Sequence, residues 1–151
     1  MKLLATKDGQ EVWLHELTKP YHLPTPFAGE HYVCILFAND ESITIKEQAA
    51  VSDQLIGTGC NYAICAGHKC ASWDDSVDWA YLATVDYKPD DETLVMTTWH
   101  ENDSVEEVLH FGLISINLTA EVCPPTLILL VGAKDGLREE IQQAIHSVWD
   151  L

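Results

Sequence analysis

The densest set of reactive side chains in this sequence lies within residues 60–78, in the stretch CNYAICAGHKCASWDDSVD. Cys65, His68 and Cys70 offer three ligands of the kind that zinc accepts in a tetrahedral site, and His100 could supply a fourth. Paired Cys-x-x-Cys knuckles are absent, and a cysteine at the end of a strand packs equally well in a core. We therefore predict no metal site from this pattern.

Nucleophilic catalysis is the second chemistry that these residues allow. Cys70 comes just before a predicted helix, whose N-terminal dipole would lower the pKa of the thiol. His68 or His100 could act as the base, with Asp40 orienting it. Asp40 and Glu101 beside His100 are an alternative set for hydrolysis. With five cysteines and seven histidines such pairings also arise by chance, so the sequence leaves open whether the protein is an enzyme.

Aromatic and acidic side chains near these loops are candidate ligand contacts. Trp99 could stack on a planar ligand, and Trp73 could form a roof over its loop. Asp74 and Asp78 are four residues apart and share one side of a helix, where they could meet a cation or an arginine of a partner. Glu101 is a further candidate. Packing and a solvated helix face explain the same residues without a ligand. No glycine-rich phosphate motif follows a strand, so we predict no cofactor.

An alternation of apolar runs and amphipathic segments must position these residues. Strands are predicted at 31–37, 61–66, 93–99 and 126–131, each followed by a helix. An Asp-Gly turn within residues 2–16 predicts a hairpin, and three prolines in residues 18–30 predict an extended connector. This order is typical of a three-layer αβα sandwich with a mainly parallel sheet. We predict four β-α units, with the N-terminal β-hairpin at an edge.

The length fits one domain, residues 1–151, with the hairpin and the proline-rich connector in 1–30 and the β-α core in 31–151. Capping patterns indicate where helices begin. Thr44 and Ser104 each precede a glutamate by three residues, which is the capping box. Ser72 precedes an aspartate in the same way, so we expect the helix after the second strand to open there.

The carboxyl ends of the strands are the expected place for a site. In open parallel sheets ligands bind there, at the point where strand order reverses. We expect the order 2-1-3-4 for the four parallel strands, which puts the reversal between the first and the third. Asp40 follows the first strand and His100 ends the third. The two should then face each other, with His68 at the same rim.

The net charge of −16, from 24 acidic and eight basic residues, is the unusual feature of the composition. No basic run is present to neutralise phosphates, so no nucleic acid is expected as a partner. No apolar run reaches the roughly 18 residues of a membrane span, and the first residues lack the apolar region of a signal peptide. We expect a cytoplasmic protein without membrane association. A basic protein partner, a cation or solubility alone would explain the charge, and a homo-oligomer through the hairpin edge is a further option.

The stretches GCNYAICAGHKCASWDDSVDWA and TTWHENDSVEEVLHF, between about Tyr32 and Ile116, resemble a family of small bacterial proteins that carries only a domain-of-unknown-function label. The shared pattern is a Gly-Cys-x-Tyr strand, a glycine turn, an acidic helix start and a Thr-Trp-His-x-x-x-Ser-x-x-Glu junction. The matching positions are Gly59, Cys60, Tyr62, Gly67, Trp73, Asp74, Asp78, Thr98, Trp99, His100, Ser104 and Glu107. The resemblance implies the same α/β core and a bacterial or phage source, and it brings no activity.

Two functions follow from these observations. The first is a non-enzymatic protein-interaction module, of the kind found among small immunity or accessory proteins, which the dispersed acidic surface favours. The alternative is a small-molecule-binding domain or enzyme at the carboxyl ends of the parallel strands. Its candidate catalytic residues are Asp40, His68, Cys70 and His100. Its candidate ligand contacts are Trp99, Glu101, Trp73 and Asp74.

Overall fold

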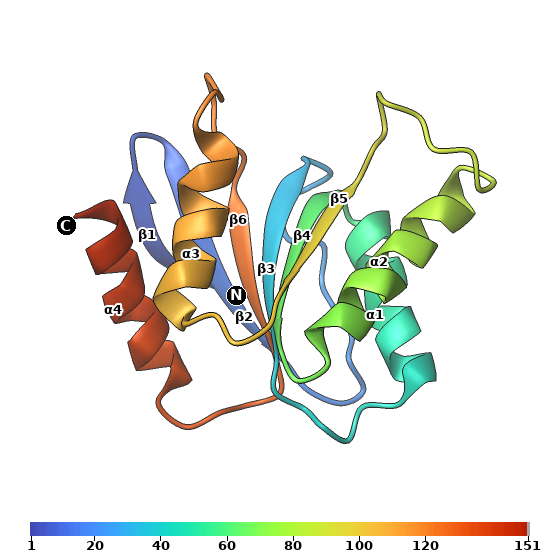
Figure 1. Ribbon diagram of the computed structural model, residues 1–151, viewed down its shortest axis with the longest axis horizontal. Coiled ribbons are helices and arrows are strands. Elements are labelled where there is room, and N and C mark those ends of the chain that lie inside the picture. The colour runs from blue at the N-terminus through green and yellow to red at the C-terminus, as the bar shows by residue number, and fades with distance from the viewer. Residues whose placement is uncertain (151) are drawn as a thin grey trace.

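The computed structural model describes residues 1–150 and contains six strands and four α-helices (Figure 1). The strands are β1 (Lys2–Lys7), β2 (Gln10–Leu17), β3 (Tyr32–Ala38), β4 (Cys60–Gly67), β5 (Met96–His100) and β6 (Thr126–Val131). The helices are α1 (Ile45–Gly57), α2 (Cys70–Thr84), α3 (Val105–Leu113) and α4 (Leu137–Trp149), with a 3-10 turn at Ser115–Asn117. Leu151, the end of the predicted domain, lies outside the described residues. The predicted α/β class is confirmed.

One sheet contains all six strands in the order β1-β2-β6-β3-β4-β5. β1 and β2 form an antiparallel hairpin, and all other neighbouring strands are parallel. The sheet is therefore mixed and mostly parallel, with β1 at one edge and β5 at the other.

The predicted order of the parallel strands is wrong. β4 lies directly beside β3 and β5 lies beyond β4, because consecutive strands joined by one helix tend to occupy neighbouring positions. The segment from α3 to Pro125 then returns the chain to the other side of β3, where β6 pairs with both β3 and β2. The strand order reverses between β3 and β6, and not between β3 and β5.

Two of the three expected helix starts are confirmed. Thr44 caps α1 and Ser104 caps α3, each in a complete capping box with the glutamate three residues later. In contrast, α2 begins at Cys70, two residues before Ser72. It follows Lys69, which has a left-handed backbone and no side-chain cap. The earlier start makes Cys70 part of the helix, and this changes the environment of its thiol.

The helices lie in two pairs on opposite faces of the sheet, α1 with α2 and α3 with α4 (Figure 1). All seven residues of β3 are buried, alternately toward one face and the other. A strand covered on both faces in this way has a continuous apolar sequence, as residues 31–37 predict. In the described part of the chain, no helix combines the length and the apolar character that crossing a bilayer requires.

Candidate functional site

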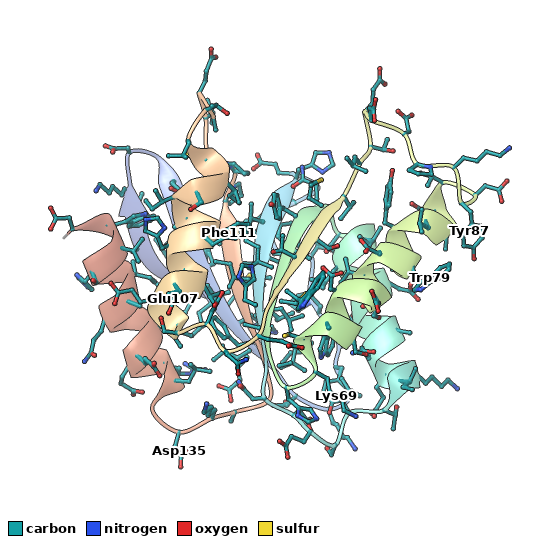
Figure 2. The ribbon with its side chains drawn as sticks, in the orientation of Figure 1. Lys69, Trp79, Tyr87, Glu107, Phe111 and Asp135 are labelled. Carbon is teal, nitrogen blue, oxygen red and sulfur yellow. The ribbon has the colours of Figure 1, made fainter. Side chains whose placement is uncertain are left out.

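The candidate residues lie at one end of the sheet. Because β3, β4, β5 and β6 are parallel, their carboxyl ends meet there, with the loops that carry Asp40, His68 and His100. Figure 2 shows Lys69, next to His68, and Asp135, from the loop after β6, at that end. The loops therefore share one end of the sheet. The side chains they carry lie in different pockets, because β4 separates β3 from β5 and the two faces of the sheet are covered by different helices.

Asp40, after β3, is held by hydrogen bonds from within the protein. The backbone amide and the hydroxyl of Ser42 donate to Asp40 Oδ1 at 2.9 and 2.6 Å. The buried Tyr21, from the proline-rich connector, donates its hydroxyl to Asp40 Oδ2. The bonds from Ser42 and Tyr21 lower the pKa of Asp40. Asp40 is therefore ionised and holds the connector in place, and both of its carboxylate oxygens already accept hydrogen bonds.

The point of strand reversal, between β3 and β6, is closed by the protein itself. The amides of Asn39 and Asp40 both donate to the carbonyl of Val131 at 2.8 Å, and the Asn39 side chain donates to the carbonyl of Gly132 at 3.1 Å. A Cβ atom on Gly132 would lie 2.8 Å from Cβ of Asp40, so only glycine fits there. The crevice where a ligand is expected is filled by these contacts.

His68 lies on the α1/α2 side of the rim. It lines a pocket of about 120 Å³ together with Asp40, Lys69 and Trp73. Its Nδ1 atom is 3.5 Å from Oε1 of Glu41, which is largely exposed. Pockets for small organic ligands usually measure about 300–1,000 Å³. This pocket has room for a few water molecules or one small ion.

His100 lies on the other face of the sheet, and the prediction that it faces Asp40 is wrong. The whole of β4 separates β3 from β5. His100 Nδ1 is 3.0 Å from Oδ2 of Asp103, and Nε2 is 3.0 Å from Oγ1 of Thr98. Its ring centroid is 4.8 Å from that of Phe111 on α3, which Figure 2 labels. His68 and His100 line different pockets, so the predicted common site is not assembled.

Cys70 does not have the environment of a reactive thiol. As the first residue of α2 it is 1% exposed, and burial raises the pKa of its thiol, opposite to the expected lowering by the helix dipole. Cys65 is also in the core, and burial raises its pKa well above the usual value. His68 is at the surface, so the three potential zinc ligands are not gathered. A structural role explains both cysteines.

Acidic side chains of α2 gather beside β5. Asp74 is only 4% exposed, and its Oδ1 atom has no hydrogen-bond partner. Burial raises its pKa, a hydrogen bond from the side chain of Thr97 opposes the rise, and the negative charges of Asp78 and Asp75 add to it. Thr97 on β5 donates its hydroxyl to Asp78 Oδ1 at 2.7 Å. Among residues 1–150, these three aspartates are the one grouping of three or more potential metal ligands within 4.8 Å of one another.

The other predicted contacts divide into core and surface. Trp73 is buried in the α1/α2 core and also lines the small pocket beside His68 and Lys69 of its loop. Trp99 is 54% exposed on the edge strand β5, and Glu101, the first residue after β5, is exposed as well. Leu94 and Met96 are exposed along the same segment. The exposed side chains of Leu94, Met96 and Trp99, with the outer backbone of β5, are called the β5 edge surface below.

The sequence reading missed the exposed aromatic pair on the outer side of α2. Trp79 and Tyr87 are both more than half exposed, with ring centroids 6.2 Å apart in an edge-to-face arrangement (Figure 2). Trp79 also lines an open groove of about 360 Å³ between α1 and α2, with Ile45 and Asp53. The available signal was its position: Trp79 lies off the apolar face formed by Trp73, Val77, Ala80 and Tyr81.

The fold defines an α/β protein with a mostly parallel sheet, in which Asp40 and His68 line one pocket and His100 lines another. The chain belongs to the family of the domain of unknown function DUF7684, whose model matches residues 12–148. The match is wider than the predicted resemblance, because it begins within β2 and ends within α4. No curated protein and no solved structure matches the chain significantly.

Proposed function

We propose that this chain is a cytoplasmic bacterial or phage protein that acts without catalysis, by binding another protein, in the manner of small immunity or accessory proteins. We propose the β5 edge surface as its binding site. One observation carries the proposal. β5 is an open sheet edge on which large apolar side chains are exposed within an acidic segment.

The open edge offers a template for a partner strand. Within residues 1–150, β5 pairs only with β4, so the backbone groups on its outer side have no strand partner. Such an edge can add an extended segment of another protein through main-chain hydrogen bonds. Trp99 is 54% exposed and Met96 is 46% exposed, and aromatic and Met side chains are enriched at protein interfaces.

The charge around this edge selects the partner. Residues 70–101 contain one lysine, Lys88, and eight acidic residues. The acidic residues are Asp74, Asp75, Asp78, Asp86, Asp90, Asp91, Glu92 and Glu101. A partner with lysine or arginine beside its apolar contacts would be attracted, and nucleic acid would be repelled. A second copy of the chain, with its own net charge of −16, would be repelled too, so the proposed partner is a different, basic protein.

The alternative function, a small-molecule site at the strand ends, has weaker support. Its residues are divided between two faces, Asp40 is used by internal hydrogen bonds, and the thiol of Cys70 is buried. The pocket that contains both Asp40 and His68 is about 120 Å³, below the size of common ligand sites. We therefore do not extend the proposal to catalysis.

Binding assays with purified products of neighbouring genes test the proposal. At least one basic product should bind at low salt and more weakly at high salt, because screening reduces attraction between surface charges. Trp99→Ala should weaken the binding by about tenfold or more, as for a central aromatic contact. The matched control is Leu3→Ala, which removes an exposed apolar side chain from the opposite sheet edge, β1. Failure of every product to bind, or equal weakening by both substitutions, would contradict the proposal.

A further inference from the structure

Three carboxylates come together in the first two-thirds of α2, with Asp78 in contact with Thr97 of β5. One carboxylate oxygen from each of Asp74, Asp75 and Asp78 lies within 4.8 Å of the others. Oxygens bound to one Ca²⁺ at about 2.3–2.6 Å can be no further apart than about 5 Å, so the spacing fits a common cation. Spacing alone does not define a site, since exposed acidic groups are common on helices.

Asp74 differs from such surface groups. Its side chain is 4% exposed, and its Oδ1 atom is buried without a donor. An ionised carboxylate that is buried without a partner is costly, by several kcal/mol, so native proteins pair nearly all such groups. The hydroxyl of Thr97 lies beside both Asp74 and Asp78: it lowers the pKa of Asp74, and its hydrogen bond to Asp78 Oδ1 measures 2.7 Å. Because a hydroxyl has a single proton, it cannot donate to both carboxylates at once.

Within the described part of the chain, no ion pair compensates the charge of the Asp74 carboxylate. The charges that act on Asp74 are those of Asp78 and Asp75, both negative. Among residues 1–150, the ion pairs are His68 with Glu41, His100 with Asp103, and Arg138 with Glu16, and none involves these aspartates. The cluster therefore has unused acceptor capacity and an uncompensated charge at the same place.

We propose that Asp74, Asp75 and Asp78 form a binding site for a divalent cation, with the Thr97 hydroxyl positioned next to it. The donors are all oxygens, which hard cations such as Ca²⁺ and Mg²⁺ prefer. The buried thiols of Cys65 and Cys70 are not part of the set. The test of this site needs only a metal ion, so the site can fail while the proposed partner binding stands, although Asp74, Asp75 and Asp78 also contribute to the acidic charge around β5. Binding would stabilise the native state, because the unfolded chain does not hold the three carboxylates together.

Thermal denaturation of the full chain, after removal of metal by a chelator, tests the site. Ca²⁺ or Mg²⁺ should raise the Tm in a saturable way, beyond the effect of NaCl at equal ionic strength, and calorimetric titration should give the stoichiometry. Asp74→Asn should abolish the saturable rise. Asp78→Asn and Thr97→Val should each weaken cation affinity by about tenfold or more. The matched control, Asp91→Asn, removes the same charge from an exposed loop and should leave the rise unchanged.

The variants keep the proposal falsifiable even if one is unstable. Asp74→Asn is isosteric and removes a buried charge, so it should fold at least as well as the parent protein without metal, as circular dichroism can check. The absence of a saturable rise with either cation would overturn the proposal and would indicate a protonated Asp74 or an arginine from a partner. A rise of equal size in the Asp74 and Asp91 variants would overturn it as well, because the effect would then be non-specific screening.

Discussion

The two faces of the sheet are filled by different kinds of residue. Between the sheet and α3/α4, the core is mainly aliphatic, with Ile35, Ile64 and Leu109 all fully buried. Helix α3 comes so close to the sheet that a Cβ on Gly112 would lie 2.5 Å from Cδ1 of Ile35. Between the sheet and α1/α2, the core holds four buried cysteines, two tyrosines and Trp73, with Asp74 at its border.

This difference suggests that one face of the sheet mainly provides stability and that the other carries the polar groups. Aliphatic side chains in close contact provide stability and no reactive group, so the α3/α4 face mainly holds the sheet in place. The α1/α2 face accepts the cost of buried polar groups, and the rim pocket and the aspartate cluster both lie on that side. His100 and its partners are the exception on the α3/α4 side. The predictions below test whether the two faces really differ in this way.

The largest expected effect is on the aliphatic face. Leu109→Ala removes a fully buried side chain from α3 and should lower the free energy of unfolding by about 2–5 kcal/mol, because both transfer and cavity terms are lost. Cys65→Ala, at a fully buried position on the other face, removes only one sulfur atom and should cost clearly less. Urea unfolding followed by circular dichroism measures both. Equal losses would contradict the division between the faces.

The second effect concerns the connector at the rim. Tyr21→Phe removes the hydroxyl that donates to Asp40, and should lower the free energy of unfolding at pH 7 by about 1.5 kcal/mol, the lower end for a bond to a charged group because Asp40 is only half-buried.

The pH dependence of this effect has a definite sign. Hydrogen bonds from Ser42 and Tyr21 lower the pKa of Asp40 in the folded state. The stabilisation is therefore present above the pKa of the unfolded state, about 3.9, and is lost as the pH falls through the lower folded value. Denaturant titrations of parent and Tyr21→Phe should give curves that differ at pH 7 and converge in acid. A constant gap at all pH values would show that the bond to ionised Asp40 is not the cause.

The third effect is a gain in stability on the α1/α2 face. In the presence of a chelator at pH 7, Asp74→Asn should raise the free energy of unfolding by about 1 kcal/mol, since it removes a buried negative charge whose Oδ1 atom has no donor. Burial raises the pKa of Asp74, so the native state takes up its proton more readily than the unfolded state. The gap between variant and parent should therefore close as the pH falls through the raised pKa. A loss of stability at pH 7 would show that a partner inside the protein satisfies Asp74.

Local signals in the sequence predicted much of this fold. The apolar run 31–37 predicts β3, because a strand that is covered on both faces has apolar residues at every position and not at every second one. The capping boxes at Thr44 and Ser104 were predictable because the side chain and the backbone group it satisfies are three residues apart. The sequence predicts the start of α2 two residues too late, because the residue before the helix, Lys69, makes no side-chain cap that a pattern could reveal.

The site was less predictable because it depends on contacts between distant segments. Strand order depends on where α3 returns the chain, and neither β5 nor β6 encodes that choice locally. His100 ends a strand as predicted, but its face follows from packing against Phe111. The sequence makes Asp40 a candidate catalytic residue, and only the fold shows that the hydroxyl of Tyr21, from the connector, donates a hydrogen bond to it. The i,i+4 spacing of Asp74 and Asp78 did predict a shared face, whereas the burial of Asp74 needed the position of β5.

The smallest expected effect on stability concerns the cysteines, whose reactivity compares buried with exposed thiols. Cys123 is the one cysteine of the chain that is not buried, and burial raises the thiol pKa of Cys34, Cys60, Cys65 and Cys70. Because the thiolate is the reactive form, native protein should show one fast thiol with an aromatic disulfide reagent and five after denaturation. Cys123→Ser should change the free energy of unfolding by no more than about 0.5 kcal/mol, yet abolish the fast reaction. Cys70→Ser should leave that reaction intact. A fast thiol that persists in Cys123→Ser and disappears with Cys70→Ser would instead mean that α2 opens at its first turn, which would restore Cys70 as a candidate nucleophile.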